Sequence, residues 1–153
     1  MDIKSGKKYP SCALSNFAPH PFVVDGVECA SMEGFLQSLK FKNPEMQKEV
    51  CKLVGFAAKS KGRNKKWDGS LWWQGVEYDR FDDEYQELLD KAYEALSKNS
   101  GFRKALLASR QSVLTHSIGR RKQKDTILTK SEFCGRLTRL RSIIKYEEEK
   151  SSE

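Results

Sequence analysis

The segment from Ser31 to Phe41 constrains the fold most strongly, because it joins an apolar surface to a polar edge. Its apolar side chains recur at helical spacing, at Met32, Phe35, Leu36 and Leu39. At about 100° per residue, Glu33, Gln37 and Lys40 share one narrow sector beside that apolar arc. The pattern predicts a helix with one buried face, capped by Ser31. The cap places Glu33 in the first turn, where the helix dipole favours a carboxylate.

The rest of the chain reads as mainly α with a small β element. Short β-forming runs at 22–24 and 27–29 flank Asp25-Gly26, which predicts a hairpin. A short buried strand is expected at Val113–His116. Further helices are expected at Pro44–Val54, Phe56–Lys61, Asp82–Lys98 and Gly101–Ser109.

The last helix has the strongest local signals. Thr129 and Glu132 have the spacing of a capping box, and apolar residues then recur at Phe133, Leu137, Leu140 and Ile144. No repeat or linker interrupts the chain, so we expect one domain at 1–146. The polar residues 147–153 are expected to form a disordered tail.

Composition narrows the class of protein. The 153 residues are 38% hydrophobic and 32% charged, which is typical of a globular domain with its own core. No apolar run is long enough for a membrane span or a signal peptide, so a cytoplasmic protein is expected. The four cysteines lack paired spacing and only two histidines are present, which argues for reduced thiols and against a metal site.

Charge favours a phosphate-bearing partner without identifying it. The net charge is +7 at pH 7, with basic clusters at 59–66 and 120–124 and an acidic stretch at 79–90. Such runs are also ordinary solvated surface. Charge alone therefore leaves nucleotides, nucleic acids and simple solubility open.

Several short motifs follow one another in the order found in a known family. They are Leu14–Phe17, Pro21–Gly26, Ser31–Glu33 with Gln37 and Lys40-Phe41, Ala58-Lys59 with Gly62-Arg63, Trp72–Tyr78, and Phe102–Leu107. Together, from Tyr9 to Lys145, the chain resembles the NADAR (YbiA-like) N-glycosidase family. The resemblance implies a single-domain YbiA-like fold. It also implies hydrolysis of a ribose C1–N bond.

That reaction suits the polar edge of the first long helix. Cleavage of the bond builds positive charge on the sugar, so a carboxylate such as Glu33 can stabilise the transition state or position water. The resemblance implies covalent chemistry at Lys40 as one route, in which an unprotonated amine attacks an opened sugar aldehyde. Glu33 and Lys40 are thus the candidate catalytic residues; a solvated stripe is the structural alternative.

Other side chains are candidates for substrate binding, and each has a structural alternative. The amide of Asn16 suits a base or ribose but is also common in turns. Lys59 and Arg63 suit phosphates, Trp72 suits a stacked base, and His116 suits a proton relay or a structural hydrogen bond. The complete predicted set is Asn16, Phe17, Gln37, Lys59, Arg63, Trp72, His116 and Gly119. No metal or redox cofactor is expected, since no ligand cluster or dinucleotide fingerprint is visible.

The chain also departs from the commonest family pattern. Gly34 follows Glu33 where many relatives have His, and the segment 116–121 replaces a Trp-Gly-containing loop. We expect a pocket between the N-terminal loop, the helix at 31–41, the Trp-rich segment and the Gly119 loop. The altered loop leaves substrate identity open.

Two substrate classes and two other functions stay open at the level of sequence. Relatives act on early pyrimidine intermediates of riboflavin synthesis or remove ADP-ribose from modified guanine. The basic surface favours an ADP-ribosyl substrate, either free or carried on nucleic acid. The alternatives are a non-catalytic nucleic-acid-binding module, which would use the basic cluster 120–124, and an ADP-ribose or nucleotide sensor. Neither membrane association nor an oligomeric state is predicted.

Overall fold

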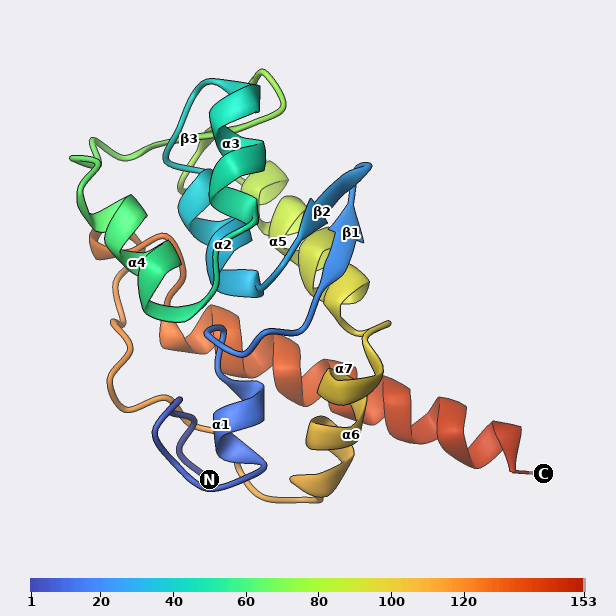
Figure 1. Cartoon of the computed structure of the whole chain (residues 1–153). Coiled ribbons are helices and arrows are strands. Elements are labelled where there is room, and N and C mark those ends of the chain that lie inside the picture. The colour runs from blue at the N-terminus through green and yellow to red at the C-terminus, as the bar shows by residue number, and fades with distance from the viewer. Residues whose placement is uncertain (153) are drawn as a thin grey trace.

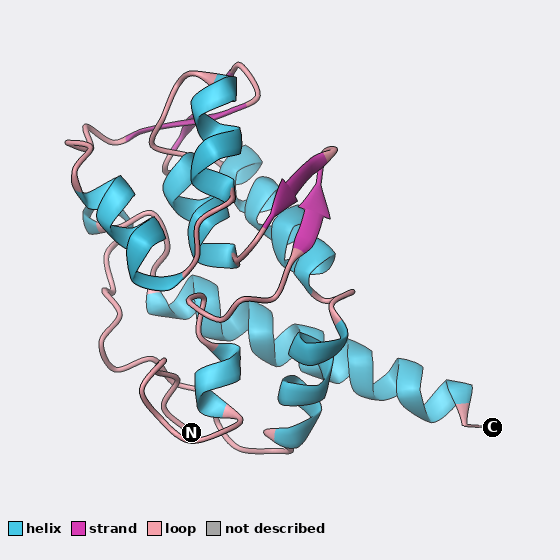
Figure 2. Ribbon diagram, viewed as in Figure 1, coloured by secondary structure: helices cyan, strands magenta, loops and turns pink. Residues whose placement is uncertain are grey.

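Helices are the main regular structure of the molecule, as the periodicity predicts (Figures 1 and 2). The computed structural model describes residues 1–152, which fold into one domain. The helices are α1 (Ser11–Leu14), α2 (Met32–Ser38), α3 (Pro44–Cys51), α4 (Gly55–Arg63), α5 (Asp83–Leu96), α6 (Ser100–Ala108) and α7 (Lys130–Ser151), with a 3₁₀ turn at Gln123–Asp125. The mainly α fold class with a small β element is therefore confirmed. None of these helices is both long and apolar enough to cross a bilayer.

Two antiparallel hairpins supply the β structure. β1 (Phe22–Val24) and β2 (Val27–Cys29) pair as predicted around Asp25 and Gly26, whose φ angles are +48° and +78°. β3 (Ser70–Trp73) and β4 (Val76–Asp79) form a second hairpin that we did not predict. Its turn residues, Gln74 and Gly75, have φ of +49° and +86°. Two left-handed residues match the twist of a tight hairpin, so Gly75 between short β-forming runs was the available signal.

Helix α2 lies at the centre of the domain, and every residue in it is buried. The Ser31 hydroxyl accepts from the Gly34 amide at 3.1 Å and donates to the Leu53 carbonyl at 3.0 Å, which confirms the predicted cap. A Cβ at Gly34 would lie 2.6 Å from that same carbonyl. The glycine is therefore needed for α2 to approach the end of α3.

Helix α7 crosses beneath this unit and extends past it (Figure 1). The capping box between Thr129 and Glu132 is present, and Phe133, Leu137, Leu140 and Ile144 are buried as expected. The expectation of a disordered tail at 147–153 needs correction, since α7 continues to Ser151. Arg103 lies 3.2 Å from Glu148 and 3.9 Å from Glu147, which supports the added turns. Glu153 lies outside the described residues.

The segment Val113–His116 does not form the strand that we expected. Thr115 makes a single parallel bridge to Asp2, in which Ile3 donates to the Thr115 carbonyl at 2.8 Å. Leu114 is buried, but Val113 is 76% exposed. The segment 113–116 thus lies beside the N-terminal loop and forms one β-bridge, because no neighbouring residue pair extends the pairing into a strand.

Candidate functional site

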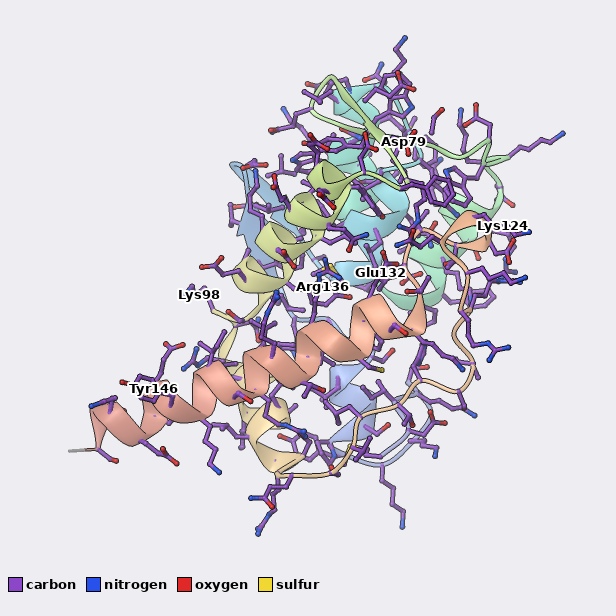
Figure 3. The ribbon with its side chains drawn as sticks, turned by 180° about the vertical axis from the view of Figure 1, so that it is seen from behind. Asp79, Lys98, Lys124, Glu132, Arg136 and Tyr146 are labelled. Carbon is purple, nitrogen blue, oxygen red and sulfur yellow. The ribbon has the colours of Figure 1, made fainter. Side chains whose placement is uncertain are left out.

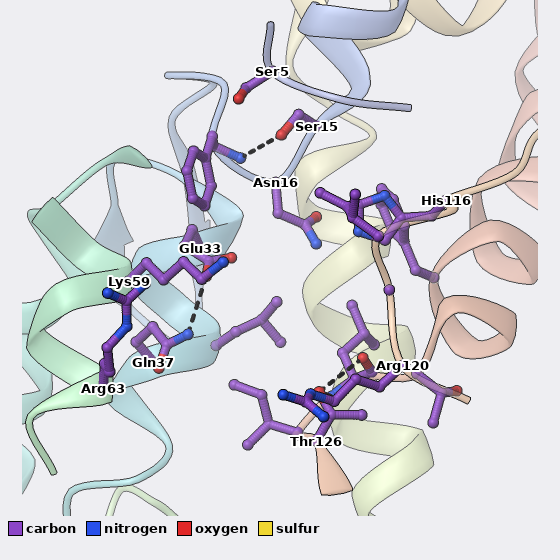
Figure 4. A pocket seen from close by; sticks show the side chains of 18 of the residues that line it. Ser5, Ser15, Asn16, Glu33, Gln37, Lys59, Arg63, His116, Arg120 and Thr126 are labelled. Carbon is purple, nitrogen blue, oxygen red and sulfur yellow. Dashed lines mark hydrogen bonds between the residues drawn. The ribbon is translucent and has the colours of Figure 1, made fainter. Parts of the chain in front are cut away.

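A cavity of about 520 Å³ opens beside α2 and collects most of the predicted site residues (Figure 4). Its walls come from the loop before α2, from α4 and from the loop 116–129. The predicted residues that line it are Asn16, Phe17, Glu33, Gln37, Lys40, Lys59, Arg63, His116 and Gly119. Lining residues that the sequence did not single out include Lys4, Ser15, Phe56, Ile118, Arg120, Asp125, Thr126 and Phe133.

Trp72 is the predicted residue that the cavity does not include. It lies on β3, where its backbone amide donates to the Leu39 carbonyl at 2.8 Å. The Lys42 ammonium lies 5.1 Å from the centre of its ring. Trp67 instead contributes to the cavity wall, with its indole N–H bonded to the Ser70 carbonyl at 2.9 Å. Side chains alternate along β3, and Trp72 lies on the half-buried face of the strand. Because the sequence did not predict this hairpin, the orientation of Trp72 could not be foreseen.

Glu33 lies at the buried base of the cavity, with 9% of its surface exposed. Its backbone amide donates to the Asn16 carbonyl at 3.0 Å, and its carboxylate accepts from the Gln37 amide at 3.0 Å. Burial raises the pKa of Glu33, against the hydrogen bond from Gln37 and the charges of Lys59, Lys40 and His116. The site thus holds a carboxylate where its charge is poorly solvated.

Lys40 lies two residues beyond α2, which ends at Ser38 and not at Phe41 as the sequence predicted, and it is partly buried. Burial lowers the pKa of its amine, and the nearby Glu33 carboxylate opposes that shift. An amine with a lowered pKa has a larger neutral fraction near neutral pH, which nucleophilic chemistry requires. The geometry therefore suits the role predicted for this residue.

Asn16 joins the cavity to the core. Its side-chain oxygen accepts from the Tyr93 hydroxyl at 2.8 Å, which leaves its amide N–H groups available as donors. Figure 4 shows this side chain directed between the two walls of the cavity. A turn role for Asn16 does not account for that arrangement, because its oxygen bonds to a helix 77 residues away in sequence.

Cations without a carboxylate partner gather on the cavity walls. Within residues 1–152, Lys40, Lys59, Arg63 and Arg120 form no ion pair. The Lys59 ammonium lies 5.8 Å from the Phe17 ring and the Arg63 guanidinium 5.4 Å from the Phe56 ring. Aromatic faces thus hold two of these charges without neutralising them. An anionic ligand is the complement of such a surface.

The loop 116–129 forms the opposite wall and is fixed at both ends. The His116 ring bonds through Nδ1 to the Ile3 carbonyl at 2.8 Å and packs edge-on against Phe133 at 5.2 Å. Beside it, a Cβ on Gly119 would lie 2.7 Å from the His116 ring. The hydrogen-bonded structural role weighed for His116 is therefore present, and the residue also lines the cavity.

A buried ion pair holds the far end of this loop. Arg80 donates to the Glu132 carboxylate at 2.6 and 3.0 Å and to the Thr126 carbonyl at 2.7 Å. Figure 3 shows Glu132 and Arg136 near the start of α7, and Arg136 also bonds to Asp90 of α5 at 2.9 Å. This network was not foreseen, because Arg80 and Glu132 are 52 residues apart in the sequence and no local pattern marks them.

The described part of the chain contains no cluster of metal-ligand side chains, and its cysteines are not paired. No three His, Cys, Asp or Glu side chains among residues 1–152 lie close enough together to hold a metal ion. The cysteines Cys12, Cys29, Cys51 and Cys134 are free thiols.

Comparison with known proteins places the chain in a family. The model of the family described as bacteriophage protein GP30.3 matches residues 8–142. The chain belongs to the GP30.3 family. A relative in Enterobacteria phage T4, an uncharacterised 17.1 kDa protein of the Gp30–rIII intergenic region, is 47% identical over 146 residues. That match covers 92% of this chain and 96% of the phage T4 protein.

The fold of the chain is similar to that of a bacterial protein. The solution structure of YbiA from E. coli matches 97% of this chain and 86% of its own, with a TM-score of 0.64 and 19% identity. The YbiA-like fold expected from the sequence is therefore confirmed. At that identity the likeness shows the fold alone.

Proposed function

We propose that the protein is an N-glycosidase that hydrolyses the ribose C1–N bond of a phosphorylated ribosyl or ADP-ribosyl compound. The observation that carries the proposal is the pairing of a buried carboxylate, Glu33, with a wall of unpaired cations in one cavity. The carboxylate suits the positive charge that develops on the sugar, and the cations suit phosphates. The YbiA-like fold is consistent with this activity.

Two routes for the reaction follow from the residues beside the sugar site. In the first, Glu33 stabilises the oxocarbenium-like transition state and orients the attacking water. In the second, the Lys40 amine attacks C1 of the ring-opened N-glycoside and displaces the base, which leaves protonated; water then hydrolyses the resulting lysine imine to the sugar and the free amine. The buried carboxylate serves both routes, so we assign the charge-stabilising role to Glu33 and leave the covalent step to a separate test.

The cavity favours an extended anionic substrate. A volume of about 520 Å³ lies within the range of roughly 300 to 1,000 Å³ that is usual for small-molecule sites. Lys59 and Arg63 on α4 and Arg120 on the loop lie on different walls, so two phosphates could be bound apart. We therefore favour ADP-ribosylated guanine over the pyrimidine intermediates of riboflavin synthesis. A nucleic acid bearing the modified guanine is a further form of the same substrate.

The experiment is a chromatographic assay for released base. The panel contains ribosylated pyrimidine phosphates, ADP-ribosylated guanine nucleotides and ADP-ribosylated DNA. We expect release from at least one, and loss of release in Glu33→Gln. Glu49→Gln is the matched control, because Glu49 is exposed on α3 and pairs only with Lys52. Saturable binding without base release would instead indicate a sensor or a nucleic-acid-binding module.

A further inference from the structure

The Gln37 amide occupies an unusual position between the catalytic candidate and a neighbouring helix. Its N–H donates to Glu33 at 3.0 Å, one turn earlier on α2. Its other polar atom, Oε1, is fully buried and has no hydrogen-bond partner in the described structure. Buried amide oxygens are nearly always bonded, so an orphaned one calls for an explanation.

Gly62 of α4 provides the surface against which this oxygen lies. A Cβ at position 62 would lie 1.7 Å from Gln37 Oε1 and 2.5 Å from Gln37 Cδ. Any side chain there would displace the amide. The backbone of α4 thus closes off the oxygen, and the N–H end of the amide remains directed at Glu33.

We propose that Gln37 is a positioning residue for the Glu33 carboxylate, and that Gly62 is the glycine that makes room for it. The inference deepens the proposed function and rests on it for the role of Glu33. The sequence suggested substrate binding for Gln37, since it lines the cavity. The structure commits one N–H of the amide to Glu33 and its oxygen to a closed contact, so at most the second N–H is left for a ligand.

The chemistry explains why an orphaned oxygen is tolerated. An ionised carboxylate accepts hydrogen bonds only, so it favours the N–H end of the amide. A rotated amide would place Oε1 against Glu33, which suits a protonated carboxyl and leaves the N–H groups without an acceptor beside Gly62. The arrangement therefore selects the ionised form of Glu33 and fixes one of its oxygens.

Other charged or titratable groups face Glu33 from every side of the site. They are Lys40 just beyond α2, Lys59 on α4, His116 on the opposite loop and Tyr93 on α5. Burial raises the pKa of Glu33, and the bond from Gln37 opposes that rise. Removal of the Gln37 amide, with Lys40, Lys59 and His116 still in place, should therefore move the titration of Glu33 to higher pH.

The direct test follows the Glu33 carboxyl by ¹³C NMR in the full chain, with its signal assigned from the spectrum of Glu33→Gln. We expect Gln37→Met and Gly62→Ala each to shift the midpoint upward. Gly62→Ala should have little further effect in a Gln37→Ala background, where no amide is left to displace. Gly135→Ala is the control, since a Cβ there meets nothing within 4 Å.

Activity gives the second readout. On a substrate that the wild type turns over, Gln37→Met should lower kcat/KM on the order of 100-fold at mildly acidic pH. The loss should shrink as pH rises, and KM should change little. An unchanged Glu33 midpoint in both Gln37→Met and Gly62→Ala would overturn the positioning role. If the midpoint shifts but no substrate is cleaved, the proposed function fails while the placement of Gln37 stands.

Discussion

At the scale of single residues, burial of Glu33 has a consequence for stability that is separable from its chemistry. The folded state raises the pKa of this carboxyl, so it binds the proton more tightly than the unfolded chain does. The protonated carboxyl therefore adds stability below its unfolded-state pKa of about 4.3. This contribution is lost as the pH rises through the higher pKa of the folded state. At neutral pH the ionised carboxylate is therefore a net cost to the fold.

The prediction is that Glu33→Gln melts at the same or a higher temperature than the wild type at pH 7. The gain should shrink toward pH 3, where the wild-type carboxyl is largely protonated in both states. Thermal unfolding followed by circular dichroism at the two pH values measures it. A large loss of melting temperature at pH 7 would show that Glu33 is structural, and its catalytic assignment would have to be withdrawn.

A second residue-scale prediction separates the two roles of Lys40. Lys40→Arg keeps the positive charge but cannot form an imine, whereas Lys40→Ala loses both functions. If the amine is covalent, Arg should be nearly inactive, and borohydride should trap a sugar adduct on the wild type during turnover. Mass spectrometry of the trapped protein measures the adduct. An active Lys40→Arg enzyme without an adduct would leave water attack assisted by Glu33 as the mechanism.

Much of the candidate site could be predicted because α2 carries its own periodicity. The spacing of Glu33 and Gln37 is local, so it fixes their common edge before any tertiary contact is known, whereas Lys40 lies beyond the observed end of the helix at Ser38. Trp72 shows the limit. Its direction depends on which face of β3 is buried, and that face is set by the strand's pairing with β4. The bond from Gln37 to Glu33 needed side-chain placement, because helical spacing allows the contact without requiring it.

At the scale of elements, the loop 116–129 depends on the buried pair between Arg80 and Glu132. Their side chains are 2% and 9% exposed. Burial opposes ionisation, but the bonds from Arg80, the Thr129 amide and Gln86 hold the pKa of Glu132 at about 2. This contribution to stability is present above the unfolded value of about 4.3. It is lost as pH falls toward 2.

Arg80→Met should therefore destabilise the protein by roughly 3 to 5 kcal/mol, because it leaves a buried carboxylate without a partner. It should also weaken ligand binding, since Thr126 loses the bond that holds the cavity wall. Lys52→Met is the control, because Lys52 pairs with Glu49 at an exposed site and should change stability by at most about 1 kcal/mol. Urea unfolding measures the free energy of unfolding of the two variants. Equal effects in the two variants would contradict a supporting role for Arg80.

Element boundaries followed from the sequence where their signals were local. The cap at Ser31, the capping box at Thr129 and the Asp25-Gly26 turn all occur at the predicted positions. The strand expected at Val113–His116 was wrong because a strand needs a partner, and only Asp2 bridges to it. The last turns of α7 were missed because Glu147 and Glu148 read as solvated tail until Arg103 is placed beside them.

At the scale of the whole molecule, charge is distributed unevenly around the cavity. The chain carries +7, yet Arg80, Arg103, Arg136 and Arg139 are paired with carboxylates. Lys59 and Arg63 of α4 and Arg120 of the loop lack such partners in residues 1–152 and line the cavity. The sequence indicated two basic clusters, but only the fold shows that they lie on opposite walls of one site.

The last prediction follows from this distribution. If these cations bind phosphates, KM for a phosphorylated substrate should rise as salt increases from about 0.05 to 0.5 M, because the screening length falls from more than about 10 Å to a few ångströms. A dephosphorylated substrate should be bound weakly and show little salt dependence. Arg63→Gln should raise KM, whereas Lys98→Gln, with the same charge change outside the cavity lining, should not. Steady-state kinetics on both substrates measures these effects. Equal salt dependence for the two substrates would mean that the net field of the protein, rather than phosphate contacts in the cavity, attracts the ligand.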